Sequence, residues 1–191
     1  IDPLSAFSER GVDYAKYRPT YPPSVIDTIL RELGEPSQLA AADVGAGTGI
    51  ASRLLAERGI HVWAIEPNTS MRTAAQNHPL VKFCDASAEQ THLPTASVDL
   101  ITSFQAFHWF NPQPTLAEFH RILKPSGRLA IAWNQRAADD EFSVEFDRLV
   151  KASMSELPTT KPQNSVARIL MSSSHFGRVR RHTFTYKHEL D

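Results

Sequence analysis

Three glycines at alternate positions constrain this chain more than any other feature of its sequence. Residues 43–49 read DVGAGTG, and they stand between a short apolar run and an amphipathic helical pattern. Glycine lacks a Cβ, so it permits tight turns and lets a ligand come close to the main chain. The pattern predicts a strand-to-helix loop that cradles a cofactor, and a plain tight turn is the alternative interpretation.

The acidic residue before the glycines narrows the choice of cofactor. A diphosphate-binding loop places the anion at a helix start, where free amide groups and the helix dipole favour negative charge. Asp43 would repel a diphosphate, but it suits a ligand that carries an ammonium group and a sulfonium. The dinucleotide fingerprint also needs a glycine where Ile50 stands, which disfavours nicotinamide-dependent reduction.

The motif Asp-x-Gly-x-Gly-x-Gly after a first strand resembles the main motif of class I S-adenosylmethionine-dependent methyltransferases. The resemblance implies S-adenosylmethionine as the cofactor and S-adenosylhomocysteine as the product. It also implies that Asp43, Gly45, Gly47 and Gly49 bind the cofactor.

Composition is that of one ordinary domain. A chain of 191 residues can bury one core, and it is short for two. We expect one methyltransferase domain over 1–191, with an N-terminal lid and first helix (1–34), a cofactor-binding core (39–133) and a substrate-side C-terminal part (139–191). The formal net charge of −1, with interspersed acids and bases, provides no general field to attract nucleic acid or an anionic membrane, so we expect neither as a partner. The resemblance implies a small-molecule substrate instead. The oligomeric state is not indicated by the sequence.

The single cysteine, Cys84, excludes an internal disulfide and favours a reducing compartment, so we expect a cytoplasmic protein. No apolar run approaches the roughly 18 residues that a membrane span needs.

Helical and strand patterns alternate along the chain. Helices are expected from Pro23, from Ile50 to Gly59, at 68–76, at 116–123 and at 142–150, and strands are expected up to Asp43 and at 61–65, 80–84, 98–103, 128–133 and 179–188, with a turn at 124–127. Such alternation predicts an α/β fold with a doubly wound, mostly parallel sheet and helices on both faces.

Polar residues follow four of these strands and predict one binding site, because ligands of parallel sheets gather at the carboxyl ends of strands. They are Asp43, Glu66, Asp85 and, after the fourth strand, the run Ser103-Phe104-Gln105, from which Ser103 is the expected cofactor contact. Glu66 can accept hydrogen bonds from both ribose hydroxyls, with a solvated strand end as the alternative. Asp85 and Ala86 would hold the adenine amino group and ring nitrogen, unless Asp85 only forms a turn. Met71 is expected on the adenine face, or else in the core.

Three further segments are similar to the methyltransferase type 11 group, and within it to trans-aconitate methyltransferase-like small-molecule enzymes. They are residues 14–22, 105–110 and 123–127, where Ser126 replaces a more usual glycine. The tyrosine-rich first segment is expected to fold over the cofactor, with Tyr14 near the substrate and Arg18 paired with the methionine carboxylate; packing on the domain surface is the alternative. Phe107 and Trp109 are expected to wall the substrate cavity.

Methyl transfer from a sulfonium is an in-line displacement in which alignment and removal of water supply much of the catalysis. A carboxylate acceptor needs no base, whereas a phenol or an amine would benefit from one. His108 is the candidate, although a lone histidine can equally be structural. The other histidines have no metal-ligand spacing, so no metal is expected.

The resemblance implies a further helix and an antiparallel seventh strand beyond residue 191. We therefore expect the final strand to be missing and the C-terminal part to be truncated, which exposes a sheet edge. This keeps open a second reading, a domain that binds S-adenosylmethionine without turnover and acts as a regulatory or truncated form.

Overall fold

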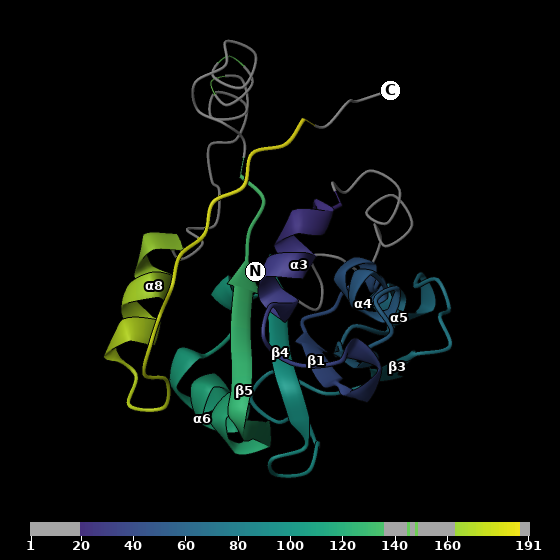
Figure 1. The fold of residues 1–191 in the computed structure, drawn as a ribbon, viewed down its shortest axis with the longest axis horizontal. Coiled ribbons are helices and arrows are strands. Elements are labelled where there is room, and N and C mark those ends of the chain that lie inside the picture. The colour runs from purple at the N-terminus through teal and green to yellow at the C-terminus, as the bar shows by residue number, and fades with distance from the viewer. Residues whose placement is uncertain (1–19, 136–144, 146–147, 149–162, 188–191) are drawn as a thin grey trace.

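One parallel sheet organises the part of the chain that the computed structural model describes, residues 20–135, 145, 148 and 163–187. The strands lie in the order β3-β2-β1-β4-β5 (Figure 1). Their bounds are β1 (Ala40–Val44), β2 (His61–Ile65), β3 (Val81–Cys84), β4 (Val98–Phe104) and β5 (Leu123–Ala132). Every described pairing is parallel, which confirms the expected α/β class.

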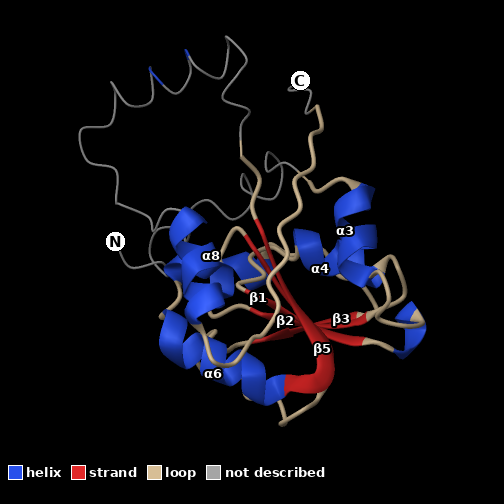
Figure 2. Cartoon of the chain, turned by 60° about the vertical axis from the view of Figure 1, so that its left-hand side comes forward, coloured by secondary structure: helices blue, strands red, loops and turns tan. Residues whose placement is uncertain are grey.

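Helices cover both faces of this sheet. They are α3 (Pro23–Leu30), α4 (Ile50–Ala56), α5 (Thr69–Thr73), α6 (Pro112–Ile122) and α8 (Gln163–Ser172), with short 3-10 helices η1 (Pro36–Gln38) and η2 (Phe107–Trp109). Figure 2 shows α6 and α8 on one side of the sheet and α3 and α4 on the other. Phe119 and Val166 belong to the apolar cluster on the first side, and Ile26 and Leu55 to the cluster on the second. The central strands are buried on both faces, which explains their near-continuous apolar sequence.

The strand order reverses beside β1. From β1 the chain goes outward to β2 and β3, and it later returns to β4 on the other side of β1. Asp43 is in register with Thr102 of β4 and with Ala64 of β2. In such sheets the crevice for a ligand opens at this reversal, beyond the carboxyl ends of the two strands.

The predicted strand boundaries agree with the structure in the first half of the chain, whereas the helix expected from Ile50 to Gly59 ends at Ala56. β2 has the predicted bounds, and β3 and β4 differ from prediction by one residue each. Asn68 caps α5 as predicted, because its Oδ1 accepts a hydrogen bond from the Met71 amide at 3.2 Å. The helix itself ends at Thr73, earlier than the predicted residue 76.

The prediction of a turn at 124–127 was wrong, because these residues belong to β5. Leu123, expected in the preceding helix, is the first residue of β5, and its pairing with Val98 is followed by a register shift to the pair Leu100 and Arg128. Residues 124–127 therefore bulge out within β5, and a bulge accommodates the same proline and glycine that indicated a turn.

The C-terminal part departs most from prediction. The predicted strand at 179–188 is not formed over 179–187, and His188 lies outside the described residues. Val179 and Tyr186 are 40% and 36% exposed, so the segment has no buried face to fix a strand register. Of the helix predicted at 142–150, only residues 145 and 148 are described, both helical; α8 was not predicted.

Candidate functional site

The glycine loop connects β1 to α4, and its glycines differ in what surrounds them. Gly45 has φ +71°, and a Cβ there would overlap the Cβ of Ala106. Gly47 has φ +57°, and a Cβ there would meet nothing within 4 Å. A Cβ on Gly49, at φ +76°, would lie 2.8 Å from the Phe83 ring. Gly45 and Gly49 thus allow close packing of the loop, whereas Gly47 borders open space where a ligand can approach the main chain.

Asp43 lies beneath this loop and is buried, with 1% of its surface exposed. Its Oδ2 accepts a hydrogen bond from Ser52 Oγ at 2.6 Å, and its Oδ1 accepts one from Thr102 Oγ1 at 2.8 Å. Burial raises the pKa of this carboxyl from 3.8 to about 6, against the lowering effect of the two hydroxyls. The carboxylate is held in place by α4 and β4, and a cation beside it would favour its charged form.

Glu66 connects the glycine loop to the next helix. Its Oε2 accepts a hydrogen bond from the Gly47 amide at 2.8 Å, and its Oε1 accepts one from the Asn68 amide at 2.9 Å. The side chain is 8% exposed, and burial raises the pKa of its carboxyl while the two amides oppose the rise. The strand-end carboxylate therefore fixes the loop and retains lone pairs for further donors.

Asp85 lies farther out, with 69% of its side chain exposed. Its Oδ2 pairs with the Arg72 guanidinium at 2.8 Å, and the same guanidinium donates to the Glu66 carbonyl at 2.6 Å. Arg72 therefore links the ends of β2 and β3, a role that the sequence analysis missed. Arg72 could have been found from its place in the sequence, because it lies on the helix that Asn68 caps and between the acidic strand ends Glu66 and Asp85.

A pocket opens at the carboxyl ends of β1 and β4. Its described lining consists of Tyr21, Asp43, Gly45, Ala46, Gly47, Thr48, Ile50, Ala51, Phe104 and Gln105. The Tyr21 and Phe104 rings pack at 4.5 Å between centroids and form an aromatic side of the pocket. Thr48 is 2% exposed, and its Oγ1 has no hydrogen-bond partner among the described residues. A buried hydroxyl without a partner indicates a place for a polar ligand atom.

Of the predicted cofactor residues, Asp43, Gly45 and Gly47 line this pocket, and Glu66 touches it through Gly47. Gly49, Met71, Asp85, Ala86 and Ser103 are outside its described lining. Met71 and Ala86 are buried, at 4% and 6% exposure.

Ser103 is fully buried, and its Oγ has no described partner. Its neighbour Thr102 is the residue that reaches Asp43. Side chains alternate along a strand, so Ser103 points to the opposite face of the sheet. Alternation separates the two side chains, and the register of β4 with β1 identifies Thr102 as the one on the Asp43 side.

The aromatic residues after β4 separate into two environments. Phe107 is 1% exposed and packs in the core with α6, not in the pocket lining. Phe110 contacts Phe107 edge to face, with centroids 5.8 Å apart, and its ring lies 3.0 Å from where a Gly45 Cβ would be. His108 and Trp109 are half-buried, with ring centroids 4.9 Å apart. Phe110 is thus the aromatic residue that borders the glycine loop.

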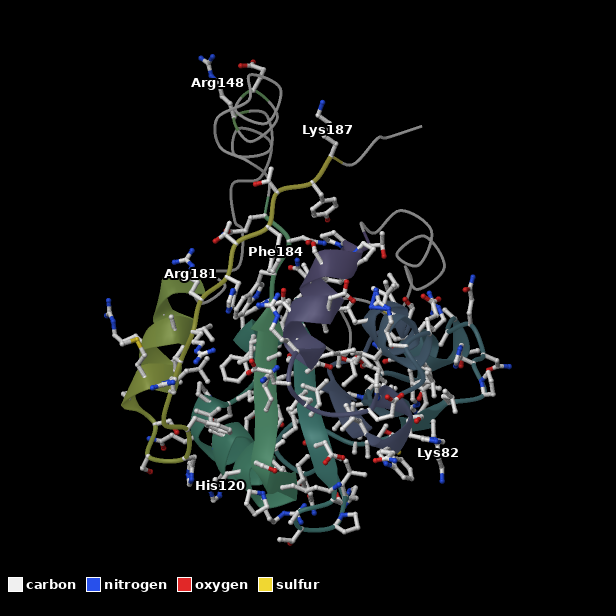
Figure 3. All side chains as sticks on the ribbon, viewed as in Figure 1. Lys82, His120, Arg148, Arg181, Phe184 and Lys187 are labelled. Carbon is white, nitrogen blue, oxygen red and sulfur yellow. The ribbon has the colours of Figure 1, made fainter. Side chains whose placement is uncertain are left out.

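Tyr14 and Arg18, and with them the predicted lid, lie outside the described residues. Within the described part, no three histidine, cysteine, aspartate or glutamate side chains gather as a metal site. The same part contains no helix with the length and apolar character of a membrane span. Figure 3 shows the basic side chains Arg181 and Lys187 on the C-terminal segment.

Residues 42–131 match the family model described as a methyltransferase domain. An uncharacterized methyltransferase of Mycobacterium tuberculosis is 36% identical over 124 residues, which are 64% of this chain and 49% of that protein. A protein of Saccharomyces cerevisiae, named as a probable S-adenosylmethionine-dependent methyltransferase, is 25% identical over 139 residues, 67% of this chain and 47% of its own length. The chain spans about half the length of these curated relatives.

Solved structures show the same fold. A protein of Anaeromyxobacter dehalogenans named as a type II methyltransferase superimposes with a TM-score of 0.59 and 36% identity, over 72% of this chain and 58% of that one. An S-adenosylmethionine-dependent methyltransferase of Aquifex aeolicus gives a TM-score of 0.53 at 23% identity, over 76% of this chain and 81% of that one.

Proposed function

Because residues 42–131 match the family model of a methyltransferase domain, we propose that this protein transfers the methyl group of S-adenosylmethionine to a small-molecule acceptor by in-line displacement. The observation that carries the proposal is the convergence of three groups on the pocket at the strand reversal. Asp43 lies beneath the glycine loop, Gly47 borders open space, and Glu66 holds the Gly47 amide. These groups come from the ends of β1 and β2, where the fold places a ligand.

The residues present fit an adenosyl sulfonium cofactor. The buried Asp43 carboxylate favours a cationic amino-acid end over a diphosphate, and Thr48 offers an unpartnered hydroxyl in the pocket. Glu66 would accept hydrogen bonds from ribose hydroxyls with the lone pairs that its two amide bonds leave. Met71, Asp85 and Ala86 would hold the adenine.

Further assignments complete the proposed cofactor site. Gly45 and Gly49 shape the loop, and Arg18 would contribute at the methionine end. Ser103 points to the opposite face of the sheet, so it would act there only through its neighbour Thr102, which holds Asp43. We expect Arg72 to share the adenine side, because it pairs with Asp85.

S-adenosylmethionine, when bound, supplies a methyl carbon already activated for displacement by its positive sulfur. The protein's part is to orient the reactants and exclude water. Tyr21 and Phe104 provide an apolar wall at the pocket, and aromatic faces attract a sulfonium by about 0.5–2 kcal/mol. Tyr14 and Trp109 remain proposed substrate contacts, whereas Phe107 is buried in the core and would act indirectly, by supporting its neighbours.

His108 is proposed to position the acceptor and to take its proton when the acceptor is a phenol or an amine. A carboxylate acceptor requires no such step. Turnover of a His108→Ala variant tests this role, with binding of S-adenosylhomocysteine measured beside it. Unchanged turnover with intact binding removes His108 from the mechanism.

Incubation with methyl-labelled cofactor and a panel of carboxylic acids, phenols and amines tests the proposed activity. We expect more than one equivalent of S-adenosylhomocysteine per protein with at least one acceptor. Binding of S-adenosylhomocysteine without any turnover would favour the alternative, a cofactor-binding domain that acts as a regulatory or truncated form.

The finer assignments rest on sequence. The segments at 14–22, 105–110 and 123–127 support an acceptor like those of trans-aconitate methyltransferase-like enzymes. The near-neutral charge supports a small molecule over nucleic acid or membrane as the partner, and the single cysteine supports the cytoplasm.

A further inference from the structure

Gln105 has an unusual backbone conformation at the rim of the pocket. It follows β4 directly, lines the pocket and has φ +59°. The left-handed region is unfavourable for a residue with a Cβ, because the Cβ crowds the neighbouring carbonyl. Such conformations persist where the surrounding structure holds them, and they cluster at functional sites. A glycine would avoid the cost, so the side chain at this position calls for an explanation.

The Gln105 side chain is held in one orientation. Its backbone amide donates to the Ala132 carbonyl at 2.9 Å, and its Nε2 donates to the Asn134 carbonyl at 3.1 Å. A backbone carbonyl can only accept, so the nitrogen end of the amide must face Asn134. No described residue donates to Gln105 Oε1, which leaves this oxygen for a ligand.

The residue that holds Gln105 is itself anchored at the pocket rim. Asn134 Nδ2 donates to the Thr20 carbonyl at 3.4 Å, and Tyr186 Oη donates to the same carbonyl at 3.0 Å. The next residue, Tyr21, lines the pocket. The ends of β4 and β5, the start of α3 and the C-terminal segment are therefore linked around one rim. Among the side chains of this network, Gln105 is the one that belongs to the described pocket lining.

We propose that Gln105 is a ligand-binding residue whose Oε1 accepts a hydrogen bond from an ammonium, amine or hydroxyl group in the pocket. The inference rests on the proposed methyl-transfer function. Asp43 lines the same pocket and favours cationic or donor-bearing groups, which are the groups an amide oxygen can bind. Two sources carry this chemistry, the α-ammonium of the cofactor and the donor group of the methyl acceptor.

Two substitutions separate the amide oxygen from the amide nitrogen. Gln105→Met removes both, whereas Gln105→Glu keeps an acceptor oxygen and loses the N–H groups. Gln113→Met, on the exposed face of α6, is the matched control. The probes for calorimetry are S-adenosylhomocysteine and its analogue without the α-amino group. Binding of phenol, aniline and benzoate to the protein saturated with S-adenosylhomocysteine is followed by NMR.

If the donor belongs to the cofactor, Gln105→Met weakens S-adenosylhomocysteine binding roughly ten-fold and leaves binding of the deaminated analogue unchanged. If the donor belongs to the acceptor, S-adenosylhomocysteine binding is unchanged and the variant loses binding of phenol or aniline but not of benzoate. In both cases Gln105→Glu stays within about three-fold of the native protein.

The proposal is overturned if Gln105→Met changes neither the cofactor nor the phenol and aniline measurements, or if Gln105→Glu loses as much as Gln105→Met. A purely structural role would lower the melting temperature and weaken binding of all probes alike, including the deaminated analogue and benzoate, which also overturns it. If the native protein binds no S-adenosylhomocysteine, the proposed function fails instead, and this result is separate from any effect of the variants.

Discussion

Among single residues, Glu66 combines a structural and a binding role in one carboxylate. It accepts the Gly47 and Asn68 amides, and it is expected to accept the ribose hydroxyls as well. In Glu66→Gln one carboxylate oxygen becomes an NH2 group. This group cannot accept a hydrogen bond, so either a backbone amide or a ribose hydroxyl loses its acceptor. Charge-assisted hydrogen bonds contribute about 1.5–3 kcal/mol, so we expect affinity for S-adenosylhomocysteine to fall ten-fold or more by calorimetry.

The control for this prediction is Glu57→Gln, at the exposed end of α4, which should bind as the native protein does. Native affinity in Glu66→Gln would contradict a ribose contact. If the loss of affinity is accompanied by a lower melting temperature, the substitution has disturbed the glycine loop rather than removed a ribose contact.

Asp43 should give cofactor binding and protein stability opposite responses to pH. Its pKa in the folded protein is about 6, raised from 3.8 by burial, so the folded state binds this proton more tightly than the unfolded state does. The free energy of unfolding should therefore fall as pH rises from about 4 to about 6, by roughly 3 kcal/mol from this group. A cationic ligand prefers the ionised form, so its affinity should fall about ten-fold between pH 7 and pH 5.

Denaturant unfolding and calorimetry across pH 4–8 measure both slopes, and Asp43→Asn is the reference because it cannot ionise. The difference in stability between the native protein and this variant isolates the contribution of Asp43 from that of Glu66. Identical pH profiles for the two proteins would contradict the assignment.

At the scale of elements, the β1-loop-α4 unit contains two glycines that should respond differently to the same substitution. Gly45→Ala places a Cβ against Ala106 at φ +71°, so it combines strain with overpacking, and we expect a loss of about 3 kcal/mol in the free energy of unfolding. Gly47→Ala, at φ +57° beside open space, should cost about 1 kcal/mol and act on binding instead.

Thermal unfolding and calorimetry with S-adenosylhomocysteine distinguish these outcomes. The expected order is Gly45→Ala as the less stable variant and Gly47→Ala as the one with weakened binding relative to its stability loss. The reverse order would mean that the open space at Gly47 is not where the ligand approaches.

The predictions from sequence agree with the structure best for elements whose apolar residues show which positions are buried. β4 was predictable because both of its faces are buried, and β2 because Val62, Ala64 and Ile65 are buried in a short apolar run. Asn68 was predictable because a cap has a fixed spacing to the amide from which it accepts a hydrogen bond. The bulge at 124–127 has the same residues as a turn, so composition could not separate them. The site followed from strand ends, whereas the choice of Thr102 over Ser103 needed the register with β1.

For the segment 179–187, alternation alone was misleading. Alternating residues predict a strand only when a sheet edge buries one face, and Val179 and Tyr186 remain exposed in the described structure. Conversely, Val166 of α8 is 1% exposed against the core. Val166, Ile169 and Leu170 recur at helical spacing, a short signal that the polar and proline-containing sequence before them obscured.

For the whole molecule, we expect the pocket at the strand reversal to bind an adenosyl sulfur compound and not to bind a pyrophosphate. Ligand that binds only the folded state stabilises it by about 2.7 kcal/mol at a concentration of 100 times Kd. For a domain of this size each kcal/mol corresponds to about 2–4 °C, so saturating S-adenosylhomocysteine should raise the melting temperature by about 5–10 °C. NADH at the same concentration should give no shift, because its diphosphate would lie beside the Asp43 carboxylate. Differential scanning fluorimetry on one preparation measures both ligands, and Asp43→Asn provides the internal comparison. A shift with NADH and none with S-adenosylhomocysteine would reverse the assignment, since the same loop geometry would then serve a phosphate.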